Sequence, residues 1–288
     1  AAADQATAVP RPAMPALVTR ALADLVGLRL QADDGIEPGQ LQAVLAKSGV
    51  FLEAGLAAGD GGAGEGDLKA VLTAAREALT QWLGGEARRP AGGALQHPPP
   101  RRGEVGAAQV ASAAMLPAAA DELGEALLER TEAALDRIRL SQYASLDPSQ
   151  EPRAPRAEAQ HKQWNAEIPV LIGRETHVIP FQISRDRRNK GSGREDKETS
   201  WRIRFSLAVE PFGPMLAQVT MVETGGEVGS VGVTMWAERP KAAEMLGASV
   251  RDLRKSLDEA GVLVDDITCI AGPPPRGDGP RSPYERRA

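Results

Sequence analysis

Aromatic residues are scarce in this sequence: Phe, Trp and Tyr together make up 3% of the 288 residues. Most of them lie in one segment, between residues 164 and 236, so the material for a dense apolar core is concentrated there. The first 160 residues have to pack mainly with Ala and Leu side chains. We therefore expect a compact C-terminal domain behind a loosely packed, Ala-rich region. The aromatic residues of the segment are Trp164, Phe181, Trp201, Phe205, Phe212 and Trp236.

Cysteine and histidine are also rare, which limits disulfide and metal chemistry. The single cysteine, Cys269, excludes an internal disulfide framework, and its apolar neighbours in an alternating pattern favour a small buried side chain. The three histidines, His97, His161 and His177, are far apart and lack the spacing of metal ligands. We expect no metal and no cofactor.

A dominant charge and a long apolar run are missing as well. The formal net charge is -5 with both signs interspersed, whereas binding to nucleic acid requires a strongly basic surface. No apolar run approaches the 18 residues of a membrane-spanning helix. The sequence predicts neither nucleic-acid binding nor membrane insertion.

Signatures of catalysis are missing too. The glycine runs at 59–66 and 225–232 lack the Lys-Ser/Thr ending of a phosphate-binding loop, and linker or hairpin turn is the better interpretation. The carboxylate pairs at 258–259 and 265–266 are adjacent in sequence, which does not place them across a cleft. No serine lies in a nucleophile elbow. We expect no catalytic residues and no enzyme.

The first half of the chain reads as helices separated by linkers. Apolar residues at helical spacing predict helices over 16–30, over about 38–59 with Gly49 as a weak point, and over 68–84 with Asp67 as N-cap. A long helix is predicted over 118–146, with a buried stripe formed by Leu123, Leu127, Ala134, Leu135, Ile138 and Tyr143. The predicted organisation is a disordered start at 1–15, a helical segment at 16–85, a linker at 86–117, the long helix, and a second linker at 147–161.

From residue 164 the period changes from helical to two. The stretch 201–209 places Trp201, Ile203, Phe205, Leu207 and Val209 on one face of a strand, and Arg202, Arg204 and Ser206 on a wet face. A hairpin precedes it and two strands follow it. The charged stretch 185–198 reads as a solvated loop, with an acidic partner as the alternative.

A helix and a last strand complete this domain. Pro240 opens the helix, in which Ala243, Leu246, Val250, Leu253 and Leu257 repeat at helical spacing, and Gly261 ends it. Five or six antiparallel strands with one amphipathic helix predict an α+β domain over 162–271, followed by a disordered tail at 272–288.

The order of these patterns resembles the C-terminal domain of the bacterial flagellar hook-length control protein. The similar stretches are "WRIRFSLAVEPFGPMLAQVTMV", "GGEVGSVGVTMWAERPKAAEML" and "VRDLRKSLDEAGVLVDDITC". Upstream segments such as "EAALDRIRLSQYASL" and "WNAEIPVLIG" are similar to parts of longer variants of the family. The turn reads "EPFGPML" where the family more often has Pro-x-x-Leu-Gly.

The resemblance implies a non-enzymatic protein of the flagellar type III export system. The N-terminal region would act as an exported ruler, and the C-terminal domain would switch export specificity. The implied partners are the export-gate switch protein and the hook and hook-cap proteins. A monomer is expected, in the cytoplasm before export and then in the flagellum or the medium. The rival hypothesis is a cytoplasmic adaptor that binds a partner without export. Candidate partner-binding residues are Pro211, Phe212, Gly213, Trp236 and Glu238.

Overall fold

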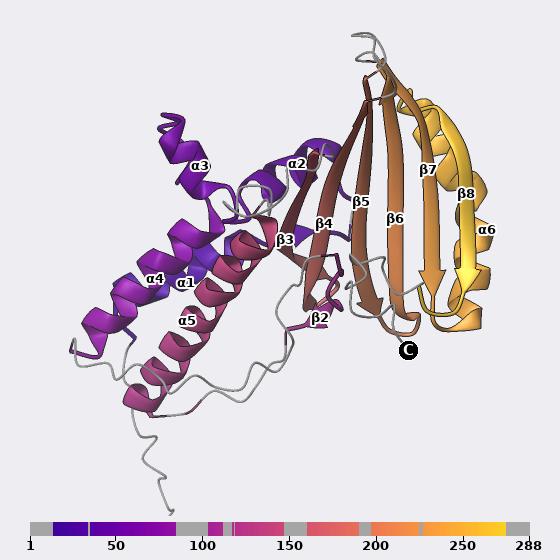
Figure 1. Cartoon of the computed structure of the whole chain (residues 1–288). Helices are drawn as coiled ribbons and strands as arrows, with labels where there is room; N and C mark the ends of the chain where they lie inside the picture. The colour runs from indigo at the N-terminus through magenta and orange to yellow at the C-terminus, as the bar shows by residue number, and fades with distance from the viewer. Residues whose placement is uncertain are drawn as a thin grey trace, which may run out of the picture.

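The computed structural model describes residues 14–33, 35–84, 103–111, 117, 119–146, 160–189, 197–224 and 227–274. The predicted disorder at 1–13 and 275–288, and most of both predicted linkers, lie outside these residues. Figure 1 shows a group of helices beside a long curved sheet, with one further helix at the opposite side of the sheet. The helices of the first group are α1 (Ala16–Gly27), α2 (Pro38–Ala46), α3 (Leu52–Ala57), α4 (Leu68–Trp82) and α5 (Ala120–Ser145).

The helices α1, α4 and α5 pack side by side through aliphatic side chains. Val18, Leu79 and Leu128 form one buried cluster, and Leu72, Leu135 and Ile138 form a second one. The N-cap of α4 is Asp67, as predicted, and its carboxylate accepts the backbone N–H groups of Lys69 and Ala70. Tyr143, predicted in the buried stripe of α5, is instead 70% exposed, because that stripe follows Leu128, Leu135 and Ile138.

The helix expected over about 38–59 is two helices, α2 and α3, the second of which ends at Ala57. Gly49 lies between them with φ +85°, a left-handed conformation that a continuing helix does not allow. The Gly49 N–H donates to Asp67 Oδ2 at 3.1 Å, so the carboxylate that caps α4 also fixes this break. A Cβ at position 49 would lie 2.9 Å from the Lys69 Cβ. The weak point in the sequence is therefore a turn that the fold requires.

The sheet follows the order β1-β3-β4-β5-β6-β7-β8, with β2 paired to β4. Neighbours from β3 to β7 are antiparallel, as predicted, whereas β1 pairs with β3 and β8 pairs with β7 in parallel. The parallel end arises because α6 (Pro240–Glu259) returns the chain along the sheet between β7 and β8. The strands are β1 (Leu30–Gln31), β2 (Gln109–Val110), β3 (Gln160–Ile172), β4 (Glu175–Asn189), β5 (Lys197–Val209), β6 (Gly213–Thr224), β7 (Glu227–Ala237) and β8 (Val264–Ala271).

The strands reach further than the sequence pattern predicted. β4 continues to Asn189 and β5 begins at Lys197, so much of the expected loop 185–198 is ladder, and only 190–196 lie outside the described residues. Charged side chains are compatible with strand pairing when they alternate across the sheet. The prediction of a loop over 185–198 was based on charge composition alone and was therefore wrong for the two strand ends. Two short strands, β1 and β2, come from regions that were predicted as helical segment and linker.

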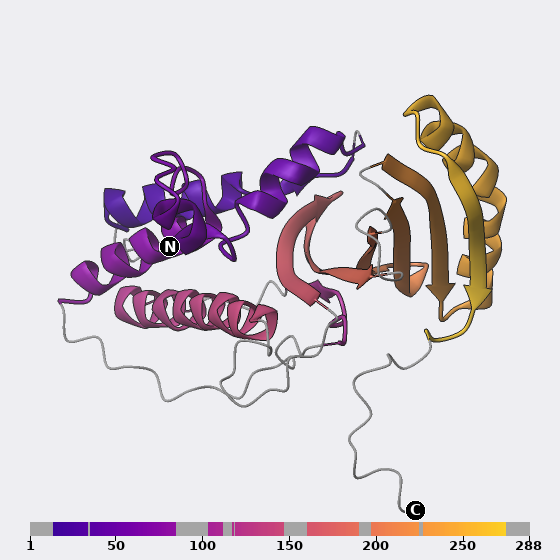
Figure 2. The same ribbon diagram turned by 45° about the horizontal axis from the view of Figure 1, so that its top comes forward.

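One face of the sheet, the apolar face, carries the core. At β3–β5 it presents Ile168, Val170, Ile179 and Phe181, and α2 packs on these side chains. At β6–β8 it presents Val231, Val233 and Ile267, covered by α6 through side chains that include Leu253 and Leu257. Figure 2 shows the helical group on the β3 side of the curved sheet and α6 on the β8 side. The predicted face with Ile203, Phe205 and Leu207 is confirmed as part of this core.

The opposite face of the sheet is polar, but several of its polar side chains are shielded from solvent. Arg202 and Arg204, predicted to be solvated, are half-buried, and Arg204 Nε donates to Gln218 Oε1 at 2.8 Å. Ser206 is buried because residues 103–111 cross this face near it. On β3, Glu167 forms a bidentate ion pair with Arg137 of α5, at 2.6 and 2.7 Å. The helical group is thus attached to both faces of the sheet.

Candidate functional site

Four of the five candidate residues lie together at one corner of the sheet, which we call the β5–β6 corner. It consists of the turn Glu210–Pro214 and the residues Glu238–Pro240 at the start of α6. Met215 pairs with Ala237, which brings the end of β7 beside the start of β6. The Glu238 N–H donates to the Pro214 carbonyl at 3.2 Å. Residues more than 20 positions apart in sequence therefore form one surface, at the lower end of β5 and β6 in Figure 1.

Arg239 holds the corner together. Its guanidinium donates from Nη1 to Glu210 Oε2 at 2.7 Å and from Nη2 to Glu210 Oε1 at 3.0 Å. A third hydrogen bond runs from Nη1 to the Pro211 carbonyl at 2.6 Å. A planar fork on a carboxylate fixes direction as well as distance, so this side chain ties the turn to the start of α6.

Gly213 is required by this arrangement. Its φ is +75°, and a Cβ on it would lie 2.6 Å from Arg239 Nε. The turn is closed on its other side by the Phe212 N–H, which donates to the Val209 carbonyl at 2.8 Å. Gly213 therefore serves the close approach of the arginine as well as the turn conformation.

The ion pair sets the electrostatics of the corner. The hydrogen bond from Arg239 is the main reason that the pKa of Glu210 lies below its ordinary value. The same hydrogen bond raises the pKa of Arg239. Both side chains are solvent-exposed, at 78% for Glu210 and 47% for Arg239, so the pair is charged and accessible over the neutral range.

The candidates differ in exposure. Pro211 and Glu238 are exposed, Phe212 is half-buried and Gly213 is buried beneath Arg239. Trp236 is only 9% exposed and pairs with Leu216, so it supports the corner from within the sheet. The residues that the sequence reasoning missed are Glu210 and Arg239. The sequence places the acidic Glu210 directly before the turn and the basic Arg239 directly after Glu238. These opposite charges predict an ion pair only once the turn and the start of α6 are known to lie side by side.

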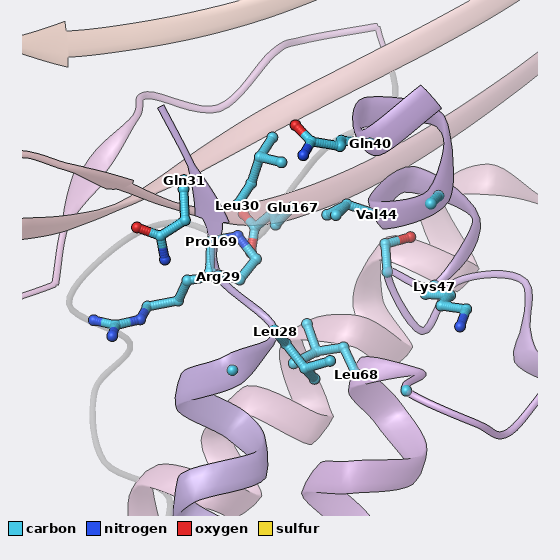
Figure 3. A pocket seen from close by; sticks show the side chains of 14 residues that line it. Leu28, Arg29, Leu30, Gln31, Gln40, Val44, Lys47, Leu68, Glu167 and Pro169 are labelled. Atoms are coloured by element: carbon cyan, nitrogen blue, oxygen red, sulfur yellow. The ribbon is translucent and has the colours of Figure 1, made fainter. Parts of the chain in front are cut away.

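A cavity lies elsewhere, between the helical group and the sheet (Figure 3). It measures about 330 Å³ and is lined by aliphatic side chains of Leu28, Leu30, Val44 and Leu68, with Lys47 near its edge. Of its charged residues, Glu167 is paired with Arg137, and Arg29 donates to Thr176 Oγ1 at 3.1 Å. These pairings leave no acid and base converging on a common point in this cavity.

Among the described residues, no group of three or more His, Cys, Asp or Glu side chains could hold a metal. No described helix is long and apolar enough to cross a membrane. Burial raises the pKa of the Cys269 thiol, in keeping with a structural role. The fold is an α+β domain with an exposed turn that is held by the Arg239–Glu210 pair.

Comparison with protein families agrees with this class. Residues 189–278 match the model of the family "Flagellar hook-length control protein FliK". The family implies flagellar hook-length control, which is a non-enzymatic function. No significant match was found among curated proteins or among solved structures.

The matched residues cover less than a third of the chain. They contain β5 to β8, α6 and the whole β5–β6 corner. The match begins at the last residue of β4, so α1 to α5 and almost all of β1 to β4 lie outside it.

Proposed function

We propose that this chain acts as an exported ruler and as the specificity switch of the flagellar export apparatus. Its β5–β6 corner would dock with the export-gate switch protein, after which the apparatus exports filament-type instead of hook-type subunits. The observation that carries the docking proposal is the clamp of Arg239 on Glu210 and Pro211, which presents a rigid exposed turn within the family-matched residues.

Rigidity supports docking for a thermodynamic reason. A loop that is already fixed loses little conformational freedom on binding, so more of the contact free energy remains as affinity. The corner also combines an exposed proline, an exposed carboxylate at Glu238 and the charged fork of Arg239. Such a mixture suits the polar rim of a transient interface.

The helical group suits the ruler role. Its clusters consist of aliphatic side chains with few aromatics, which gives each helix a modest packing energy to overcome when the chain is extended for export. We propose that this region samples the hook and hook-cap proteins during passage. The chain would act as a monomer, held in the cytoplasm before export and found afterwards in the flagellum or the medium.

The test uses complementation of a strain that lacks the gene. Pro211→Ala with Glu238→Ala changes two exposed residues of the corner, and Arg251→Ala with Asp252→Ala on the exposed face of α6 is the matched control. We expect the corner variant to be exported normally while hooks become overlong and filaments are lost. The control should assemble normal filaments. The stronger change of Pro211, Phe212 and Gly213 together to Ala should give the same phenotype.

Two results would contradict the proposal. Normal hooks and filaments in both corner variants would remove the corner as the docking surface. A chain that never reaches the medium, in a strain with working export, would instead favour the cytoplasmic adaptor. Hook lengths by electron microscopy and immunoblots of the medium provide both readouts.

A further inference from the structure

The strands β4 and β5 separate halfway along the sheet and leave a notch. The two strands pair from Phe181–Phe205 to Asn189–Lys197. The remaining residues of β5, up to Val209, continue the ladder with β6 but have no pairing with β4. The separation begins beside Pro180, which has no N–H to donate to a ladder. Below this point the edge of β4 that faces β5 is open to another strand.

The chain fills this notch with its own residues 103–111, which we call the strap. Within the strap β2 pairs with β4 in antiparallel orientation, Gln109 opposite Val178 and Val110 opposite His177. The Ala111 N–H donates to the Thr176 carbonyl at 2.7 Å. Figure 1 shows β2 beside the lower end of β4. The strap is thus a strand added to an exposed strand edge, a geometry that proteins also use to bind extended peptides.

Buried polar side chains on the sheet donate to the backbone of the strap. Gln182 Nε2 donates to the Glu104 carbonyl at 3.1 Å, and Ser206 Oγ donates to the Gly106 carbonyl at 2.6 Å. Both donors are buried, with 4% and 8% of their surface exposed. Both acceptors are backbone carbonyls, which every extended peptide offers. These two hydrogen bonds therefore do not depend on the side chains of the strap.

The same face carries donors that the strap does not use. Asn165 is 2% exposed, and its Oδ1 accepts from Gln163 Nε2 and Gln182 Nε2. Its Nδ2 has no hydrogen-bond partner within the described residues, and the same holds for Arg202 Nε. A buried donor without an acceptor is unfavourable by about 1–3 kcal/mol. Within the described residues, this face therefore retains donors without an acceptor.

We infer that the notch is an exchangeable strand-acceptor site, and that release of the strap opens it to an extended segment of a partner protein. The segment that fits has small, uncharged side chains where it crosses the sheet. This follows from the strap itself, in which the small residues Gly106, Ala107 and Ala108 lie between the contact with Ser206 and the pairing with β4, with Gly106 beside Pro180. The inference does not depend on the proposed function, because it does not involve the β5–β6 corner. The strand that pairs with the strap, β4, lies almost wholly outside the family-matched residues.

Release of the strap is tested on the full-length chain with a fluorescein-labelled peptide of sequence GEVGAAQVA. Ala111→Pro removes the N–H that bonds to Thr176, whereas Val110→Thr keeps every backbone donor at a side chain that is 45% exposed and serves as control. We expect the Ala111→Pro chain to bind the peptide at least tenfold more tightly than the wild type and the control. A peptide with Leu in place of its second glycine should bind more weakly.

A locked chain tests the site without removing a backbone hydrogen bond of the strap. Val110→Cys with His177→Cys, in a Cys269→Ser background, joins a directly opposed pair of the ladder. The oxidised chain should not bind the peptide, and reduction should restore the wild-type level. The inference is overturned if the locked and reduced chains bind equally. It is overturned as well if a folded Ala111→Pro chain, checked by circular dichroism, fails to bind, or forms a dimer by light scattering instead.

Discussion

At the scale of single residues, the contact between Gly213 and Arg239 makes the corner sensitive to one methyl group. Gly213→Ala introduces a Cβ at a positive φ, against the guanidinium that holds Glu210. We expect it to lower the free energy of unfolding by about 1–2 kcal/mol, partly from the backbone and partly from the displaced arginine.

Urea unfolding of the Gly213→Ala chain measures this loss. Arg239→Ala provides the matched background, because without the guanidinium the added methyl group has only the backbone conformation to oppose it. The Gly213→Ala loss should therefore be smaller in the Arg239→Ala chain than in the wild type. Equal losses in the two backgrounds would show that the arginine does not constrain this position.

The ion pair of the corner also predicts a pH dependence. The folded-state pKa of Glu210 is lowered from 4.5 by the hydrogen bond from Arg239. The stabilisation from this pair is therefore present above that value and is lost as the pH falls through the lower folded-state pKa. An NMR titration of the Glu210 side chain should show a midpoint below the ordinary value. The midpoint should return to that value in Arg239→Ala, and an unchanged midpoint would contradict the clamp.

At the scale of elements, α6 shows what periodicity can predict. Its apolar stripe, its start at Pro240 and its packing on the sheet follow the sequence pattern, because a stripe at helical spacing has to bury itself against another element. The strand face with Ile203, Phe205 and Leu207 was predictable for the same reason. β1 and β2 were not, since two residues carry no period and their pairing is decided by distant strands.

The candidate site was predictable in part. The turn residues Pro211 and Gly213 have a local signature, and so does the end of β7 before a helix. The Arg239–Glu210 clamp has none, because it depends on the strand register that brings Met215 opposite Ala237. The burial of Ser206 was missed for a similar reason, as the strap that crosses its face comes from far upstream in the chain.

The packing of α6 leads to a prediction about one side chain. Leu253 is half-buried in the cluster of Val231, Val233 and Ile267. Leu253→Ala should lower the free energy of unfolding by about 2 kcal/mol, at the low end for buried leucines because part of its surface stays wet. Met245→Ala, on the same helix and 47% exposed, is the control and should change little. Thermal melts that move equally for both variants would contradict the packing of α6 on the sheet.

At the scale of the whole molecule, the ruler proposal predicts that hook length depends on chain length. An insertion of 30 linker residues at Gly92 adds about 45 Å as helix or about 100 Å fully extended. Hooks should lengthen within that range, whereas the switch should work normally because the corner lies far downstream of the insertion. Electron microscopy of hook lengths, with filament counts from the same cells, measures both effects. Unchanged hook lengths would remove the ruler role and leave the hook-length control domain in place.

The order of strands in the sheet has a mechanical consequence. From β3 to β8 each strand lies beside the one before it in the chain, and β1 lies at the outer edge. A force applied at the N-terminal end therefore loads one edge strand at a time, and each rupture transfers the load to the next strand. Single-molecule pulling from the N-terminal end, with the chain anchored at α6, should give a series of small extensions, with β7, α6 and β8 as the last unit to yield. The β5–β6 corner would stay intact until everything before β5 is already drawn out into a thread.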